Sequence, residues 1–361
     1  MKNICIIDYD LSVIGGVEQV TASLSSALAD YYQVHVLSLC MSKGTEPAYE
    51  LDKRVHFKAC TEKPERLRNM SKNLKPILID YFRENNIDVA IIQETYAGIL
   101  TSQTLRKTKA RLIFADHGAL MNQWDRKDMV FIRFISSLFC HKVVTLTEQN
   151  RKAYISKFLT PKRKISCIYN WVDLNIPRSD SYESNSNRII SAGRFGKEKG
   201  FDMLVKAFAP VAEKHPDWHL DIFGDGEMME TVKELIAEYG ISDNVHLMGM
   251  RKDLAERYKD YAMYVLPSYR EGMPLVLLES KANRLPIVSF DILTGPREIV
   301  RDGIDGILVK PYDLQELTDS ICKLIENEDM RKSYSDASQE NLDKFSKETI
   351  LNNWKNLIET I

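Results

Sequence analysis

Residues 267–283 read PSYREGMPLVLLESKAN, and this stretch decides how the rest of the chain is interpreted. A short apolar run at 264–266 predicts a strand, which stops at a polar, glycine-containing loop. The pattern then predicts a helix that starts at Pro274, because the first helical position needs no N–H donor. Two carboxylates, Glu271 in the loop and Glu279 inside the helix, bracket that start. The stretch is therefore interpreted as a strand, a turn and a helix with two acids.

The start of this predicted helix suits an anion or a sugar oxygen. Free N–H groups converge at the positive end of a helix, and here they belong to Gly272, Met273, Leu275 and Val276. Glu279 follows about a turn and a half later, at a distance that suits the ribose of a nucleotide. Taken alone, the stretch is explained equally well as an ordinary strand-turn-helix with a solvated acid.

A second anion-binding pattern lies at residues 193–200, GRFGKEKG, directly after the apolar run 188–192. Three glycines let the backbone approach an anion closely, while Arg194 and Lys199 supply two cations on one short loop. This combination suits a diphosphate, although a basic surface loop leading into a helix is the simpler alternative. Two such patterns at the ends of strands in one half of the chain favour a ligand site, since open parallel sheets bind ligands there.

Apolar runs that predict strands alternate with segments of helical periodicity along the whole chain. In the first half these runs lie at 4–7, 34–37, 89–92, 112–114 and 143–146. In the second half they lie at 189–192, 220–223, 245–247, 264–266, 287–290 and 307–309. Such alternation predicts parallel sheets with helices on both faces. The expected fold class is therefore α/β, with two Rossmann-like domains.

The boundary between the two domains is expected between Asn170 and Arg188, where LNIPRSDSYESNSN is polar, contains a proline and lacks periodicity. This places an N-terminal domain at residues 1–172 and a C-terminal domain at 173–344. The last segment, 345–361, carries apolar residues at helical spacing and predicts a C-terminal helix.

Length and composition indicate a globular protein. The 361 residues suffice for two domains with their own cores, and 44% of them are hydrophobic. No stretch approaches the ~20 apolar residues of a membrane span, and the first apolar run, 4–7, is too short for a signal peptide. The six cysteines show no paired spacing, which favours reduced thiols and a cytoplasmic location.

The net charge of -2 hides an asymmetry between the two halves. Residues 1–170 carry 25 Lys and Arg against 17 Asp and Glu, whereas the remainder carries 24 against 34. The basic residues of the first half either face anionic lipid or a phosphorylated acceptor, or they lie on ordinary helix faces exposed to water. Its basic clusters are Lys53, Arg54, Lys63, Arg66, Arg68, Lys72 and Lys75, and Arg106, Lys107, Lys109 and Arg111. Nucleic acid is not expected, because aromatic residues do not interleave these clusters and no binding motif occurs.

One amphipathic stretch, MVFIRFISSLFC at residues 129–140, fits a helix at a lipid interface. A buried core helix explains the same pattern, and this alternative is favoured because such runs are more often buried.

The patterns above resemble the retaining glycosyltransferases of family 4, a group that includes bacterial capsule and polysaccharide enzymes. The Glu-x7-Glu element of that family matches Glu271 and Glu279, and the cations of its C-terminal domain match Arg194 and Lys199. Other matching motifs are GGVE at 15–18, FADHG around His117, NWVD at 170–173, GDGE at 224–227, HLMG at 246–249 and GPREIVRDGIDGILV at 295–309. The resemblance covers nearly the whole chain, and its C-terminal motifs are the more specific ones.

The resemblance implies two Rossmann-like domains that face each other across a cleft, the GT-B fold, with the last helix crossing back to the first domain. It also implies retaining, metal-independent transfer of a hexose or N-acetylhexosamine from a nucleotide sugar, with a UDP-sugar favoured. The implied acceptor is a hydroxyl of a glycan, lipid-linked, in cell-surface polysaccharide synthesis. The protein would then be cytoplasmic, in peripheral contact with an anionic membrane through its N-terminal domain.

The roles of individual residues follow from the same resemblance. Arg194 and Lys199 meet the charge of the leaving diphosphate, helped by N–H groups near Gly16 and Met273. Glu279 accepts hydrogen bonds from the ribose hydroxyls, and Glu271 and His117 lie near the transferred sugar. The nucleotide pocket also includes Gly272, Pro274 and Leu275.

No metal or other cofactor is expected beside the donor substrate. The string Asp8-Tyr9-Asp10 is interpreted as a turn at the end of the first strand, with Asp10 near the acceptor. Three alternatives stay open: a sucrose- or trehalose-type synthase, a nucleotide-sugar epimerase, and a catalytically silent sugar-binding protein.

Overall fold

A computed structural model describes residues 1–172, 182, 185–251 and 253–361. The chain divides into two compact units. The first unit contains Met1–Asn170 and Ile350–Ile361, and the second unit contains Trp171–Thr349. Most of the predicted linker between Asn170 and Arg188, including Asp173 of the NWVD motif, lies outside the described residues.

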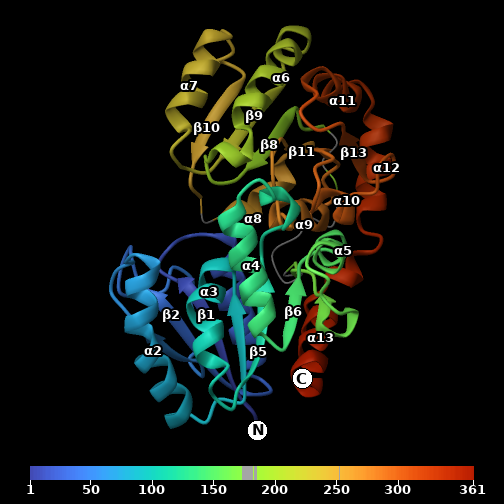
Figure 1. Ribbon diagram of the computed structural model, residues 1–361. Helices are drawn as coiled ribbons and strands as arrows, with labels where there is room; N and C mark the ends of the chain where they lie inside the picture. The colour runs from blue at the N-terminus through green and yellow to red at the C-terminus, as the bar shows by residue number, and fades with distance from the viewer. Residues whose placement is uncertain (173–181, 183–184, 252) are drawn as a thin grey trace. The chain divides into compact units, whose positions relative to one another are not determined.

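The first unit is built on a parallel sheet of seven strands in the order β3-β2-β1-β4-β5-β6-β7 (Figure 1). The strands are β1 (Asn3–Asp10), β2 (Gln33–Cys40), β3 (His56–Ala59), β4 (Val89–Gln93), β5 (Arg111–Asp116), β6 (Lys142–Thr145) and β7 (Ile165–Cys167). The central strand β4 is buried along its whole length, because helices cover both faces of the sheet. The two outermost strands were not predicted, since β3 is mostly exposed and β7 has only three residues.

Six helices pack in the first unit: α1 (Gly16–Leu28), α2 (Leu67–Glu84), α3 (Thr95–Leu105), α4 (Lys127–Phe139), α5 (Glu148–Lys157) and most of α13 (Lys347–Thr360). The C-terminal helix begins at Lys347 rather than at residue 345, because a short 3-10 turn, Leu342–Phe345, precedes it. Lys2 Nζ donates to the carbonyl of Ile358 at 2.8 Å, so the end of α13 is tied to the first strand. The chain thus returns to the unit in which it started.

The second unit repeats the architecture with a parallel sheet of six strands in the order β10-β9-β8-β11-β12-β13 (Figure 1). The strands are β8 (Arg188–Ala192), β9 (His219–Phe223), β10 (Val245–Gly249), β11 (Met263–Leu266), β12 (Ile287–Phe290) and β13 (Gly306–Val309). The helices are α6 (Phe201–Lys214), α7 (Met229–Glu238), α8 (Leu254–Arg257), α9 (Leu275–Ala282), α10 (Pro296–Ile299), α11 (Leu314–Glu326) and α12 (Glu328–Ser338). Both sheets therefore confirm the predicted α/β class with two Rossmann-like domains.

The strand order fixes where loops gather. In the first unit β1 pairs with both β2 and β4, and in the second unit β8 pairs with both β9 and β11. At such a point the order of the strands reverses, and the loops that leave the two central strands open a crevice at the carboxyl edge of the sheet. The predicted motifs at 193–200 and 267–283 leave β8 and β11, the two central strands of the second unit.

Candidate active site

The loops after β8 and β11 lie in direct contact within the second unit. Gly200 adopts a left-handed conformation with φ +68°, and a Cβ atom there would lie 2.2 Å from the carbonyl oxygen of Pro267. Only glycine satisfies both the backbone conformation and the close approach. The structure thus brings together the two motifs that the sequence separates by about 70 residues.

Lys199 and Glu271 connect these two loops through an ion pair. Lys199 Nζ lies 2.7 Å from Glu271 Oε1, which also accepts a hydrogen bond from the Ser268 hydroxyl at 2.7 Å. The Thr294 hydroxyl donates to the backbone carbonyl of Glu271 at 2.6 Å and fixes the loop from the other side. An ammonium group has three donors, so Lys199 can hold Glu271 and still donate to an anion.

Arg194 presents an exposed guanidinium on a well-fixed backbone. The next residue, Phe195, is fully buried, and its N–H donates to the Asp225 carbonyl at 2.9 Å. Gly224 packs so closely that a Cβ atom there would lie 1.9 Å from the Gly193 carbonyl oxygen. No ion pair to Arg194 occurs among the described residues. Its charge is therefore available to a ligand, while the GDGE loop holds the backbone beneath it.

Glu279 extends from α9 and is partly shielded from solvent. Burial raises the pKa of Glu279 above its usual value, and the hydrogen bond from the Tyr258 hydroxyl to Glu279 Oε2, 2.8 Å long, opposes that shift. Tyr258 is fully buried in the 3-10 turn Tyr258–Asp260 and was missed by the sequence analysis. Nothing local marks it, because it contacts a residue 21 positions later.

The predicted helix start at Pro274 is wrong by one residue. Helix α9 begins at Leu275, and Pro274 is the extended N-cap residue. The Pro274 carbonyl already accepts the hydrogen bond from Leu277 N–H at 3.1 Å, so proline serves here as the cap. Met273 and Pro274 are buried, whereas Gly272 and Leu275 keep some exposure at the loop.

In the first unit, Gly16 opens α1, as the glycine pair predicted. The preceding Gly15 is in extended conformation, and a Cβ atom there would lie 2.3 Å from Glu18 Oε2. A larger residue at Gly15 would thus displace the end of the Glu18 side chain, which folds back over the start of its own helix.

His117 follows β5 and contacts Gln93 at the end of β4. His117 Nε2 lies 2.5 Å from Gln93 Oε1, and burial lowers the pKa of His117 to about 4, with the Asp116 charge acting in the opposite direction. The imidazole is thus neutral near pH 7 and can donate or accept a hydrogen bond. Gln93 Nε2 is buried and has no hydrogen-bond partner in the described part of the chain, which makes it a functional candidate that no sequence signal indicated.

Asp116 is the buried acid that holds the His117 loop. Arg133 Nε lies 3.1 Å from both Asp116 carboxylate oxygens, and the Tyr154 hydroxyl donates to Oδ2 at 2.8 Å. Burial alone would raise the pKa of Asp116, but the Arg133 charge and the Tyr154 hydroxyl hold it below its usual value.

Three further acids lie at the same edge of the first sheet and have no cationic partner among the described residues. Burial raises the pKa of Asp8 to about 6, of Glu18 to about 7 and of Glu94 to about 8, and repulsion from neighbouring acids, which is that of Asp10 for Asp8, adds to each shift. Glu94 also has φ 61°, a conformation that non-glycine residues rarely adopt. Such backbone strain concentrates at functional sites, and no sequence signal marks it.

The predicted strand-end turn at Asp8-Tyr9-Asp10 is also corrected, because all three residues lie within β1. Asp10 accepts hydrogen bonds from Ser12 N–H at 3.1 Å and from Ser42 N–H at 3.2 Å, so its carboxylate caps the loops that follow β1 and β2. Within the described part of the chain, no three His, Cys, Asp or Glu residues are arranged to hold a metal ion.

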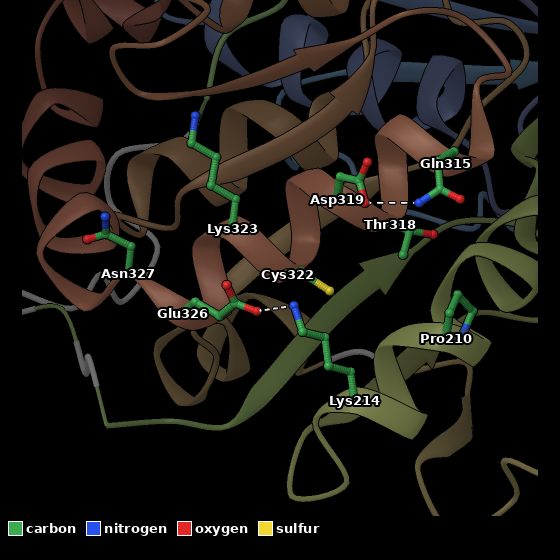
Figure 2. Close-up of a pocket in the computed structure, with 9 residues that line it drawn as sticks. All are labelled: Pro210, Lys214, Gln315, Thr318, Asp319, Cys322, Lys323, Glu326 and Asn327. Carbon is green, nitrogen blue, oxygen red and sulfur yellow. Dashed lines mark hydrogen bonds and ion pairs between the residues drawn. The ribbon is translucent and has the colours of Figure 1, made fainter.

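A surface hollow of about 590 Å³ lies apart from these residues, between α6 and α11. Figure 2 shows two contacts among its polar groups: Lys214 Nζ lies 2.5 Å from Glu326 Oε1, and Gln315 donates to Asp319 at 3.0 Å. None of the candidate site residues lines it. The loops after β8 and β11 therefore form the better candidate site.

Two family models together cover most of the chain. Residues 14–176 match Glycosyltransferase Family 4, and residues 175–341 match Glycosyl transferases group 1. The first match covers the unit with His117, and the second covers the loops that carry Arg194, Lys199, Glu271 and Glu279.

Three known relatives align with the chain over all or nearly all of their length. The chain is 28% identical to an uncharacterized glycosyltransferase of Haemophilus influenzae, covering 99% of this chain and 100% of the relative. It is 29% identical to the amylovoran biosynthesis glycosyltransferase AmsD of Erwinia amylovora, again over 99% and 100%. It is 23% identical, over 96% of both chains, to the Campylobacter jejuni enzyme N-acetylgalactosamine-N,N'-diacetylbacillosaminyl-diphospho-undecaprenol 4-alpha-N-acetylgalactosaminyltransferase.

Solved structures show the same fold. Sucrose-phosphate synthase of Thermosynechococcus elongatus superposes with a TM-score of 0.88 at 17% identity, covering 99% of this chain and 98% of the other. Anabaena Alr3699/HepE in complex with UDP and glucose superposes with a TM-score of 0.84 at 17% identity, covering 99% of both. The chain therefore belongs to the glycosyltransferases that join a family 4 domain to a group 1 domain on two parallel-sheet Rossmann-like domains.

Proposed function

We propose that the protein is a retaining, metal-independent glycosyltransferase that moves a hexose or N-acetylhexosamine from a UDP-sugar to a hydroxyl of a lipid-linked glycan. One observation carries this proposal: the Lys199–Glu271 contact joins the loops after β8 and β11, and Arg194, which has no ion pair among the described residues, lies on the first of them. Two cations on fixed loops, together with the N–H groups at the start of α9, make a preorganised site for a diphosphate.

In this proposal the bond between the sugar and the diphosphate breaks, and its electron pair stays on the leaving phosphate oxygen. Arg194 and Lys199 offset that charge without a divalent ion. The acceptor hydroxyl attacks from the same face as the leaving group and passes its proton to a leaving phosphate oxygen. Glu271, held by Lys199 and Ser268, would hydrogen-bond the sugar and stabilise positive charge at its anomeric carbon.

Two further residues would orient the donor. Glu279 would accept hydrogen bonds from the ribose hydroxyls, with the Tyr258 hydroxyl holding one carboxylate oxygen in place. The neutral imidazole of His117 would hydrogen-bond a hydroxyl of the donor sugar, as the family resemblance implies, with Gln93 fixing its orientation.

The known relatives support the class of donor and acceptor. The Anabaena structure was solved with UDP and glucose, the Erwinia relative is named for amylovoran biosynthesis, and the Campylobacter relative is named for a diphospho-undecaprenol-linked saccharide. Among the described helices, none is long and apolar enough to span a bilayer. A lipid-linked acceptor would therefore require peripheral contact with the cytoplasmic face of a membrane, which the basic first half of the chain favours.

A thermal-shift screen of the purified protein against UDP, GDP, ADP and their sugars tests the donor class. We expect a selective shift with UDP or a UDP-sugar that persists in the presence of EDTA. The responding sugar is then incubated with a lipid-linked saccharide, free UDP is measured, and the anomeric configuration of the product is read by NMR. Retention of configuration with EDTA present supports the proposal, whereas inversion or loss of activity with EDTA contradicts it.

The same assay separates the alternatives. An epimerase would change the sugar of the nucleotide donor and release no UDP. A disaccharide synthase would release UDP with a free monosaccharide as acceptor. A silent sugar-binding protein would show the thermal shift and release no UDP with any acceptor.

A further inference from the structure

Helix α4 exposes large apolar side chains along one face. Phe131 is 60% exposed, Phe134 is 39% exposed and Leu138 is 50% exposed, and their spacing of three and four residues places them on the same side of the helix. The opposite face, with Met129 and Ile132, is buried against the unit. The favoured interpretation of residues 129–140 as a buried core helix therefore holds for one face of α4 and not for the other.

The exposed apolar face continues onto the end of α5. The Phe134 ring packs edge-on against the Phe158 ring at 5.4 Å, and the adjacent Leu159 is 81% exposed. We call Phe131, Phe134, Leu138 and Leu159 the α4 patch. A single exposed apolar residue is ordinary, but a contiguous group of this size marks an interaction surface.

Basic side chains border the α4 patch. Lys164 Nζ donates to the Leu138 carbonyl at 3.1 Å, and Lys157 Nζ lies 5.5 Å from the centre of the half-exposed Trp124 ring. Arg106 lies over the Phe139 ring at 5.6 Å. From residue 129 to residue 170 the sequence contains a single acid, Glu148, which pairs with Arg151. The nearest acids before this stretch are Asp125 and Asp128, and Asp128 pairs with Arg126, so basic side chains outnumber acids along the border.

We propose that the α4 patch docks the protein on an anionic lipid surface, with the apolar side chains in the boundary between headgroups and acyl chains. An amphipathic helix with apolar residues on one side and lysines at its rim has the chemistry of an interfacial anchor. The lysines and arginines meet lipid phosphates, where each adds attraction that salt weakens. This inference rests on the proposed lipid-linked acceptor for its purpose, since docking would bring the first unit to that acceptor.

Other occupants and other surfaces fit less well. Basic α2 is another candidate for lipid contact, but its apolar residues Met70, Leu74 and Leu78 are buried, and Leu67 is the one large apolar side chain that this described helix exposes. A second copy of the chain would place identical basic borders opposite each other across a twofold axis. An anionic bilayer offers phosphates to the basic border and an apolar interior to the exposed side chains.

Co-sedimentation of the full chain with vesicles tests the inference. We expect binding to vesicles of phosphatidylcholine with phosphatidylglycerol, weak binding to phosphatidylcholine alone, and a loss of affinity as salt increases. Phe131→Ser combined with Leu138→Ser should weaken binding at least tenfold, because two side chains no longer enter the bilayer. Lys157→Gln combined with Lys164→Gln should weaken it about fivefold for each charge removed.

The matched control variants carry the same types of substitution at exposed positions outside the α4 patch. Ile304→Ser changes an apolar residue of the second unit that is 49% exposed, and Lys72→Gln with Lys75→Gln removes two charges from α2. Both controls should bind vesicles like the unchanged protein. All variants should keep the thermal shift with UDP, which shows that they are folded.

Several outcomes would overturn the inference. These are the absence of binding to anionic vesicles, an equal loss in the α2 control, or self-association that Phe131→Ser abolishes while vesicles stay unbound. Vesicle binding without sugar transfer to any acceptor would remove the proposed function and leave the docking surface intact. Sugar transfer without vesicle binding would leave the proposed function intact and remove the docking surface.

Discussion

The two units share an architecture and differ in the charge they place at the same position. Both are parallel sheets whose strand order reverses at a central pair, β1/β4 in one and β8/β11 in the other. At that edge the second unit carries Arg194 and Lys199, whereas the first carries several buried acids. Topology thus decides where loops converge, and the side chains on those loops decide what they can bind.

The two edges are also stabilised differently. In the second unit, glycines at 200 and 224 let loops touch, so the cations stand on a fixed backbone without being buried. In the first unit the acids themselves are wholly or partly buried, and among the residues that the structure describes only Asp116 of this group has a cationic partner, Arg133. The comparison therefore separates an edge prepared for an anion from an edge that carries an excess of carboxyl groups.

Removing the partner of Asp116 should have the largest effect. Arg133→Met leaves a buried carboxylate without its cation, and breaking a buried pair typically costs about 3–5 kcal/mol of unfolding free energy. Urea unfolding should show this loss in the first unit. Arg151→Met, which breaks the more exposed pair with Glu148, should cost less than about 1 kcal/mol. Equal losses in the two variants would show that Asp116 does not depend on its ion pair.

The cationic edge is tested by Lys199→Ala. If Lys199 stabilises charge that develops on the diphosphate, turnover should fall about 10²–10³-fold, with a smaller change in affinity for UDP. Steady-state kinetics and calorimetric binding measure the two effects separately. The control is Lys197→Ala, an exposed lysine two positions earlier on the same 3-10 turn. A similar loss in the control would assign the effect to the general charge of the loop.

Much of this architecture could be predicted from the sequence because its signals are local. Strands buried on both faces, such as β4, leave uninterrupted apolar runs, and glycine-rich loops directly after strands mark the carboxyl edge. The motifs at 193–200 and 267–283 were expected at strand ends of one sheet for the same reason, whereas the direct contact between them emerges only in the structure. The edge strand β3 escaped prediction because its exposed sequence, HFKA, lacks an apolar run.

Other features depend on contacts that no local pattern encodes. Tyr258 contacts Glu279 only because a turn and a helix pack together in the folded unit. The raised pKa of Glu94 arises from burial and from two acids that are distant in sequence, and its φ of 61° is set by the packing around it. Gln93 becomes notable only once its amide is found buried beside His117.

Substitution of Glu279 tests the nucleotide site, and its expected effect is intermediate in size. Glu279→Gln keeps the shape of the side chain but removes its charge, so UDP should bind about 10- to 100-fold more weakly if the ribose hydroxyls donate to the carboxylate. Isothermal titration calorimetry measures this change. Glu256→Gln, at an exposed position of α8, is the matched control and should bind UDP normally. Unchanged affinity in Glu279→Gln would place the ribose elsewhere.

The acidic edge should respond to pH, with the smallest expected effect. Burial and two neighbouring acids raise the pKa of Glu94 to about 8, so the folded state holds this proton more tightly than the unfolded state, where the value is about 4.3. Its contribution to stability is complete below about pH 4 and is lost as the pH rises to about 8. Glu94→Gln should therefore raise the melting temperature by a few degrees at pH 8–9, with the gain vanishing toward pH 4.

Glu359 and the backbone of Glu94 supply the controls for this last test. The pKa of Glu359 is lowered by hydrogen bonds from Lys2 and Tyr32, so Glu359→Gln should have the opposite sign and reduce stability slightly above about pH 5. Glu94→Gly relieves the φ of 61° at every pH, whereas Glu94→Gln keeps that backbone and changes only the charge. A gain from Glu94→Gln that did not vary with pH would therefore mean that repulsion among carboxylates does not destabilise this edge.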